Sequence, residues 1–338
     1  MTKSKPKAPT RRRPLTLDHY VEGVLAGDRA ILGRAISLLE SNRRDHQDKA
    51  QELLHRLLPH SGGAHRVGIS GVPGAGKSTF IEALGSNLTE SGKKVAVLTV
   101  DPSSGVSGGS ILGDKTRMNK LGRDPNAFIR PSPTSGSLGG VHRKTRETIL
   151  CCEAAGFDTL LIETVGVGQS EVAVSNMVDF FLVLMLPGAG DELQGIKRGI
   201  LELADLIVVN KADANPQGAK IARREYLNAL KLMRPLSEHW KPDALVCSAL
   251  KNEGLDKIWR RVLEHHTALS DSGDLEQRRH QQQLAWMWNM VEEQLLGAFK
   301  SDTDVRGQLK KLEKQINSGD LTATAAAKAL LQSFGALS

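Results

Sequence analysis

Cysteine is scarce in this chain, and its placement argues against disulfide or metal chemistry. The 338 residues include three cysteines, Cys151, Cys152 and Cys247. All three lie inside segments with the pattern of helices or strands, and their spacing is not that of metal ligands. We therefore interpret them as core thiols of a protein in a reducing compartment, and we expect a cytoplasmic location.

Long hydrophobic runs are also missing. No apolar stretch reaches the roughly 18 residues that a membrane-spanning helix needs. The longest run, Phe180–Leu186, has the length of a central β-strand. The N-terminus lacks the apolar segment of a secretory signal, and no repeat of fixed period stands out. With 40% hydrophobic and 25% charged residues, the composition is that of a soluble protein with a substantial core, and we expect no membrane partner.

Acidic residues are absent from the first 13 positions, which carry much of the formal net charge of +7. We predict that residues 1–14 are a disordered, solvated basic tail. A nucleic-acid-binding arm and a remnant targeting sequence are the alternatives, but the prolines would interrupt an amphipathic transit helix. We expect no nucleic-acid partner. The basic residues of the tail are Lys3, Lys5, Lys7, Arg11, Arg12 and Arg13.

A glycine-rich segment matches the phosphate-binding pattern G-x-x-x-x-G-K-[ST]. It lies between a strand-like segment, Arg66–Ser70, and a helix-like segment. Glycines let backbone N–H groups surround a phosphate chain, the lysine supplies charge to the outer phosphates, and the serine hydroxyl faces Mg²⁺. This context predicts a nucleoside triphosphate site rather than an accidental glycine-rich turn. The predicted phosphate-binding residues are Gly71, Val72, Pro73, Gly74, Ala75, Gly76, Lys77, Ser78 and Thr79.

A second motif, Asn210-Lys211-Ala212-Asp213, identifies the base. It follows the apolar run Leu206–Val209, and α/β sheets bind ligands at the carboxyl ends of their strands. The Asp213 carboxylate can accept two hydrogen bonds from guanine, whereas adenine would leave it unpaired. Lys211 can cover one face of the purine, and Asn210 can brace the loop. A solvated helix start is the alternative, but the order behind a phosphate loop favours GTP. The backbone loop predicted to meet the guanine carbonyl is Ser248, Ala249 and Leu250.

Short apolar segments alternate with helical ones between about residue 64 and residue 266. This alternation predicts an α/β fold, a P-loop GTPase with a mostly parallel sheet flanked by helices. Helical extensions lie on both sides, with Asp28 as the predicted N-cap of an early helix. We therefore predict a helical extension at 15–62, a GTPase domain at 63–268 and a helical dimerisation arm at 269–338. The predicted strands are Arg66–Ser70, Val95–Val100, Ala127–Arg130, Thr159–Glu163, Phe180–Leu186, Leu206–Asn210 and Ala244–Cys247.

The C-terminal arm carries apolar side chains at helical spacing. Leu284, Met287, Trp288 and Val291 recur on one helix face, and a face with this much apolar surface needs a partner. We favour a homodimer interface, with packing against the chain's own GTPase domain as the alternative.

Carboxylates follow two further strands and predict a Mg²⁺ site. Asp101 comes after Val95–Val100, and Glu163 comes at the end of the segment that starts at Thr159. Mg²⁺ in phosphate sites is held by one or two carboxylates, so Ser78, Asp101 and Glu163 form a predicted ligand set. Gly166 can turn its N–H toward a γ-phosphate. Asp101 as a cap of the turn at Pro102 is the alternative.

These motifs together resemble the G-protein chaperones of cobalamin enzymes, of the MeaB/ArgK type, which are relatives of the nickel-insertion GTPases. The resemblance covers nearly the whole chain. The segments that carry it are Gly71–Thr79, Asp101–Ser104, Gly109–Met118, Glu163–Glu171, Gly188–Lys197 and Asn210–Asp213.

The resemblance implies a GTPase that serves an adenosylcobalamin-dependent acyl-CoA mutase, above all methylmalonyl-CoA mutase, by gating cofactor loading and by protecting or rescuing the mutase. It implies GTP/GDP and Mg²⁺ as ligands, Asp101 and Asp114 near the metal, and Glu163 at the second switch. It further implies that Asp191, Gln194 and Lys197 belong to a mobile loop that couples the partner to the nucleotide. A plain strand-to-helix connection is the alternative for that loop.

Proteins of this kind are slow GTPases alone. Arg117 and Lys197 are the cationic side chains that we expect to reach the transferring phosphoryl group, since an inserted cation relieves the charge that develops there. A solvated charge on a helix is the alternative for each residue.

Three other classes of function fit the sequence less well. A small-molecule kinase could use the same phosphate loop but would rarely need the Asn-Lys-x-Asp motif. A nickel metallochaperone normally shows a histidine-rich tract or a Cys/His pair, whereas the 10 histidines of this chain are scattered. A nucleic-acid-binding regulator would depend on the basic tail alone.

Overall fold

The structure is a computed structural model that describes residues 15–100, 118–131, 138–164, 169–188 and 198–336. The chain divides into two compact units, residues 1–278 and 279–338, which are described separately. The predicted basic tail, residues 1–14, lies outside the described residues. Within the described ranges, no helix is long and apolar enough to cross a membrane.

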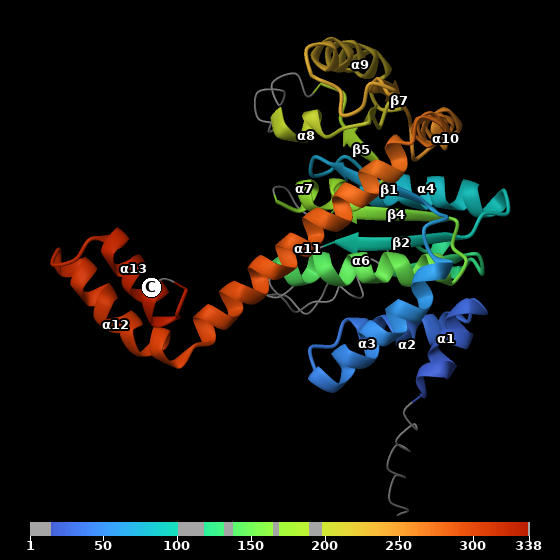
Figure 1. Cartoon of the computed structure of the whole chain (residues 1–338). Helices are drawn as coiled ribbons and strands as arrows, with labels where there is room; N and C mark the ends of the chain where they lie inside the picture. Colours follow the sequence, from blue (N-terminus) through green and yellow to red (C-terminus); the bar gives the residue numbers. More distant parts are fainter. Residues whose placement is uncertain (1–14, 101–117, 132–137, 165–168, 189–197, 337–338) are drawn as a thin grey trace, which may run out of the picture. The chain divides into compact units, whose positions relative to one another are not determined.

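The first unit is built on a seven-stranded sheet with the order β3-β2-β4-β1-β5-β6-β7 (Figure 1). Every neighbouring pair of strands is parallel. The predicted α/β fold with a parallel sheet is confirmed, and each predicted strand end lies within one residue of the observed end. The strands are β1 (His65–Gly71), β2 (Val95–Val100), β3 (Ala127–Arg130), β4 (Thr159–Thr164), β5 (Phe180–Met185), β6 (Leu206–Val209) and β7 (Asp243–Val246).

Helices flank the sheet and precede it in the chain. The helix that begins at Arg29 is capped: the Asp28 carboxylate accepts hydrogen bonds from the N–H groups of Ala30 and Ile31, as its predicted N-cap role requires. The helices and 3₁₀ turns of this unit are α1 (Leu17–Leu25), α2 (Arg29–Leu39), α3 (Arg44–Leu57), η1 (Leu58–His60), α4 (Lys77–Glu90), η2 (Leu121–Arg123), α6 (Leu138–Ala154), α7 (Gln169–Ser175), α8 (Arg198–Glu202), α9 (Pro216–Lys231), α10 (Leu255–Ser272) and the first residues of α11 (Asp274–Ser301).

The sheet separates two hydrophobic cores. Because successive strand residues face opposite sides, Ala96 and Leu98 of β2 belong to one core and Val95 and Val97 to the other. The first core is completed by α1, α2, α3 and α6, and α6 lies between β2 and the pair α2 and α3 (Figure 1). The second core is completed by α4, η2 and α10. Both faces of the central strands are therefore buried, which explains their continuous apolar sequences.

A buried carboxylate fixes the chain just before β6. Asp205 accepts a hydrogen bond from the Phe181 N–H at 2.8 Å, and the Arg278 guanidinium lies 3.4 Å from the same oxygen. Nε2 of His265 lies 3.6 Å from the other oxygen, which is an electrostatic contact rather than a hydrogen bond. Burial raises the pKa of Asp205, but the interactions with Arg278, His265 and the Phe181 N–H together lower it by a larger amount. The pKa of Asp205 therefore lies below its usual value.

The second unit contains the rest of α11, with α12 (Thr303–Ser318) and α13 (Ala323–Ser333). Its small core includes Val305, Leu312 and Ala326, and the rings of Phe299 and Phe334 meet at 5.2 Å. Along α11 a stripe of apolar side chains is 38% to 60% exposed, far more than is usual for such residues. The members of this stripe are Leu284, Met287, Trp288, Val291 and Leu295.

We predict that Arg278→Gln destabilises the first unit by about 3 kcal/mol, because it leaves the buried Asp205 carboxylate without its cation. Arg260 provides the control, since it pairs with Asp256 at 4.0 Å on the exposed surface of α10. Arg260→Gln should cost less than about 1 kcal/mol. Urea unfolding of the two variants measures both values, and equal stabilities would show that the buried pair contributes nothing.

Candidate nucleotide site

The phosphate loop connects β1 to α4 and has three glycines with positive φ values. Gly71, Gly74 and Gly76 have φ values of +151°, +77° and +86°, which L-residues rarely adopt. A Cβ on Gly71 would lie 2.3 Å from the carbonyl oxygen of Leu184 in β5. A Cβ on Gly76 would lie 3.0 Å from Nδ2 of Asn210. The loop is therefore shaped by left-handed turns and by close contact with the next two strands of the sheet.

The lysine of the motif is held over the loop. Nζ of Lys77 donates a hydrogen bond to the carbonyl oxygen of Gly71 at 2.9 Å. Burial lowers the pKa of Lys77 from its usual value, while the carboxylates of Glu163 and Glu171 act in the opposite direction. Lys77 is the first residue of α4, so its positive charge and the positive end of the helix dipole both lie at the phosphate loop. Both favour the binding of a phosphate group.

Glu171 is a residue that sequence reasoning does not single out. It lies in α7, its side chain is buried, and its charge acts on Lys77. In the sequence, the indication of a role for Glu171 is that it ends Glu163–Glu171, one of the segments that carry the family resemblance.

Two of the predicted magnesium ligands meet in the structure. The Ser78 hydroxyl donates to Oε1 of Glu163 at 3.2 Å, and Glu163 is only 4% exposed. Glu163 lies at the carboxyl end of β4, in register with Ile69 of β1 and Thr99 of β2. A hydroxyl and a buried carboxylate are hard oxygen donors, so these residues fit Mg²⁺ chemistry.

Asn210 connects its own loop, after β6, with the phosphate loop and with the loop after β7. Its Nδ2 donates to the carbonyl oxygen of Ala75 in the phosphate loop at 2.8 Å. Its Oδ1 accepts from the Ala249 N–H at 3.0 Å and from Sγ of Cys247 at 3.4 Å. One buried amide thus uses its donor toward the phosphate loop and its acceptor toward the loop predicted to meet guanine. The bracing role predicted for Asn210 corresponds to these contacts.

Lys211 and Asp213 of the Asn-Lys-x-Asp motif lie next to the phosphate loop and the predicted base loop, respectively. Lys211 has a φ of +60°, and its Cε lies 3.8 Å from the position a Cβ would take on Gly76, so its stem extends over the phosphate loop. The Ser248 hydroxyl donates to Oδ1 of Asp213 at 2.6 Å. This hydrogen bond is the main cause that lowers the pKa of Asp213 below its usual value. The same hydrogen bond orients the Asp213 carboxylate toward the loop that contains Ser248.

Leu250 completes the predicted base loop and is 78% exposed. The Lys251 N–H donates to the Ser248 hydroxyl at 3.1 Å, so Ser248 orders both its own loop and Asp213. Other predicted residues cannot be placed: Asp101, Asp114, Arg117, Gly166, Asp191, Gln194 and Lys197 lie outside the described residues.

A phosphate loop after β1, a hydroxyl and carboxylate pair beside it, and a base motif after β6 together define a P-loop GTPase. The more particular identity comes from comparison with known proteins. Residues 32–304 match the family described as methylmalonyl Co-A mutase-associated GTPase MeaB, and the chain belongs to that family. The predicted family and the predicted GTPase activity are both confirmed.

Individual relatives agree with this assignment. The Escherichia coli GTPase ArgK is 49% identical over 290 residues, which cover 86% of this chain and 88% of that protein. The mouse methylmalonic aciduria type A homolog, named as mitochondrial, is 49% identical over 94% of this chain and 79% of its own length. A crystal structure described as a LAO/AO transport system kinase is 39% identical, with a TM-score of 0.77 over 94% of this chain and 97% of that chain.

The guanine motif yields a direct test. Asp213→Asn should weaken GTP binding by roughly 2 to 4 kcal/mol and shift the preference toward xanthosine triphosphate, because the amide cannot accept from both N1–H and the 2-amino group. Asp256→Asn, at an exposed position of α10, is the matched control and should bind GTP as the parent does. Titration calorimetry with both nucleotides measures the change, and an unaltered GTP affinity in Asp213→Asn would exclude the guanine role.

Proposed function

We propose that this GTPase is a chaperone of an adenosylcobalamin-dependent acyl-CoA mutase, above all methylmalonyl-CoA mutase. In this proposal GTP binding and hydrolysis gate cofactor loading and protect or rescue the mutase. The observation that carries it is a guanine-type nucleotide site in a chain whose family is described as methylmalonyl Co-A mutase-associated. The mouse relative, named for methylmalonic aciduria, supports the same partner.

The chain's own residues have distinct roles in nucleotide binding. Residues 71–79 wrap the phosphates, and Lys77 leaves the Gly71 carbonyl to meet their charge. Asp213 and Lys211 hold the base, while Asn210 keeps both loops at a fixed separation. GTP and GDP are therefore the ligands of the proposed cycle.

We assign the Mg²⁺ ligands to Ser78, Asp101, Asp114 and Glu163. The contact between Ser78 and Glu163 supports this set, because it places two hard oxygen donors beside the phosphate loop. When bound, the ion neutralises charge on the outer phosphate oxygens. Gly166 is assigned to the γ-phosphate by its place two residues after β4.

The coupling to the partner is assigned to the segment that contains Asp191, Gln194 and Lys197, with Arg117 as a further cation near the transferring phosphoryl group. These roles come from the family resemblance. An inserted cation is a large contributor to phosphoryl transfer, so a partner that positions Lys197 would raise the rate of hydrolysis.

The C-terminal arm, residues 269–338, is proposed to form a homodimer. The stripe of Leu284, Met287, Trp288, Val291 and Leu295 supports this proposal, because its spacing matches one face of α11 and each side chain is more than one third exposed. The boundaries 15–62 and 63–268 are retained for the helical extension and the GTPase domain.

A reducing, cytoplasmic location is proposed from the cysteines. Cys151, Cys152 and Cys247 are free and buried. Burial raises the pKa of Cys151 and Cys247 to about 12, which is the behaviour of inert core thiols.

The metal assignment predicts different effects for two neighbouring residues. Glu163→Ala should leave GTP affinity within about threefold of the parent but slow hydrolysis at least about tenfold, because Glu163 acts at Mg²⁺ and the switch. Lys77→Ala should reduce both affinity and turnover, since its charge meets the phosphates directly. Single-turnover hydrolysis and nucleotide titration separate the two effects. Glu225→Ala, on the exposed side of α9, serves as control, and parental hydrolysis by Glu163→Ala would remove Glu163 from the mechanism.

The chaperone proposal predicts stimulation by the partner. Methylmalonyl-CoA mutase should accelerate GTP hydrolysis by the parent protein, and Lys197→Ala should keep the slow basal rate but lose most of the acceleration. Single-turnover hydrolysis with and without saturating mutase tests this, with mutase binding measured separately. Equal stimulation of both proteins would exclude Lys197 from the coupling.

The same assay tests the proposed partner class. If adenosylcobalamin-dependent acyl-CoA mutases give the parent no stimulation, the chaperone role is wrong. Phosphate transfer to added arginine, in place of release to water, would instead indicate a small-molecule kinase.

A further inference from the structure

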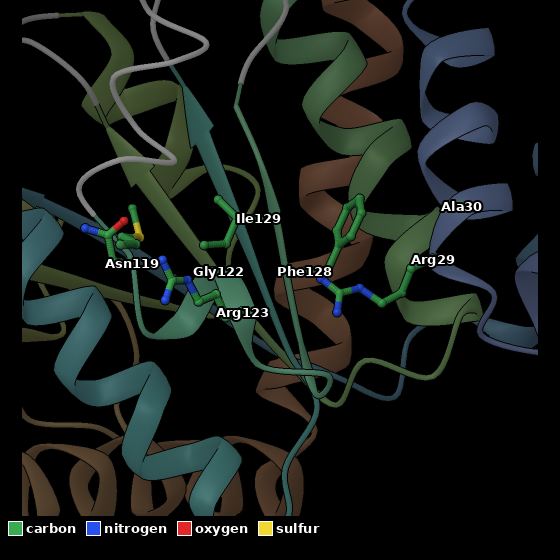
Figure 2. Close-up of a pocket in the computed structure, with 8 residues that line it drawn as sticks. Arg29, Ala30, Asn119, Gly122, Arg123, Phe128 and Ile129 are labelled. Atoms are coloured by element: carbon green, nitrogen blue, oxygen red, sulfur yellow. The ribbon is translucent and has the colours of Figure 1, made fainter.

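A cavity of about 380 Å³ lies at the open edge of the sheet, outside the nucleotide site (Figure 2). It lies beside β3, the first strand in the sheet order. Among the residues that line it are Arg29, Ala30, Gly122, Arg123, Phe128 and Ile129. A volume of this size falls in the range of small-molecule sites.

The cavity joins two parts of the first unit around the edge of β3. Phe128 and Ile129 are consecutive strand residues, so their side chains face opposite sides of the sheet, and Figure 2 shows them pointing apart. Phe128 belongs to the core that the N-terminal helices complete, and Ile129 to the core that η2 completes. A molecule in this cavity would touch both the first turn of α2 and the turn η2.

The lining is cationic. Two arginines contribute to it, and no acidic side chain does so among the described residues. Nη1 of Arg29 donates to the backbone carbonyl of Asp124 at 3.1 Å, and among the described residues Arg29 forms no ion pair. Within the described part of the chain, Arg123 forms no ion pair.

The nearest carboxylates in sequence are already engaged elsewhere. Asp28 accepts from the N–H groups of Ala30 and Ile31, and Asp124 accepts from the Asn126 N–H at 2.8 Å. The lining thus combines two guanidinium groups with apolar side chains, among them Phe128 and Ile129.

We propose that this cavity binds a small organic oxyanion, a phosphate or carboxylate group attached to an apolar body. Guanidinium groups match the planar, two-oxygen face of such anions, and apolar walls accept the body. The site is independent of the nucleotide and of the mutase proposed above. Its ligand would hold the N-terminal helices to the edge of the GTPase sheet.

The test uses the full chain saturated with GDP and Mg²⁺, so that the phosphate loop is occupied. Titration calorimetry with phenyl phosphate and with benzoate should show binding at one site, and benzyl alcohol, which has the ring without the charge, should show none. The tighter of the two anions identifies the acidic group. Inorganic phosphate should bind more weakly than phenyl phosphate, and equal binding would overturn the organic part of the proposal.

Two substitutions locate the binding. Arg123→Gln removes one exposed cation and should weaken phenyl phosphate binding roughly tenfold. Gly122→Leu should abolish it, because the leucine side chain would fill the cavity. A Cβ at Gly122 would lie 3.7 Å from Cδ1 of Ile129, which is an ordinary contact.

Arg224→Gln, which removes an exposed charge from α9, is the matched control and should bind as the parent does. Thermal unfolding confirms that each variant is folded before titration. The proposal is overturned if the parent binds neither anion at millimolar concentration, or if Arg123→Gln and Gly122→Leu both bind like the parent.

Discussion

The nucleotide site depends on the side-chain amide of Asn210. Its Nδ2 holds the phosphate loop through Ala75, and its Oδ1 holds the base loop through Ala249. Both partners are backbone atoms of loops far apart in sequence, and the amide itself is buried. Because a buried amide costs free energy unless its polar atoms are paired, the two loops and the amide order one another. This one residue therefore ties the phosphate loop to the predicted base loop.

The parallel sheet explains why these groups meet at all. Every strand of the first unit runs in the same direction, so β1, β4, β6 and β7 end at one edge. The phosphate loop, Glu163, the Asn-Lys-x-Asp motif and the Ser248 loop each follow or close one of these strands.

The N-terminal extension and the start of α11 are part of the same framework. Helices α1, α2 and α3 cover α6 and contribute to the first core, so they belong to the folding unit of the sheet. At the opposite end of the strands, Arg278 reaches the buried Asp205 beside the start of β6. Removal of one member of such a buried pair is destabilising, because it leaves an uncompensated charge in the interior. Arg278 is the last residue of the first compact unit, so this ion pair holds the end of that unit to the start of β6.

The amino-acid sequence alone determined the α/β fold, the strand positions and the identity of the nucleotide, because period-two and continuous apolar runs and the two nucleotide motifs are local patterns. The sequence also predicted that Ser78 and Glu163 belong to one set of Mg²⁺ ligands. Only the tertiary structure decided how Asn210 joins the two loops, that Glu171 acts on Lys77, and that Arg29 and Arg123 line one cavity. These contacts join residues from separate elements, and no local pattern encodes a distance across a sheet. The physical reason is that packing, and not spacing along the chain, places such side chains together.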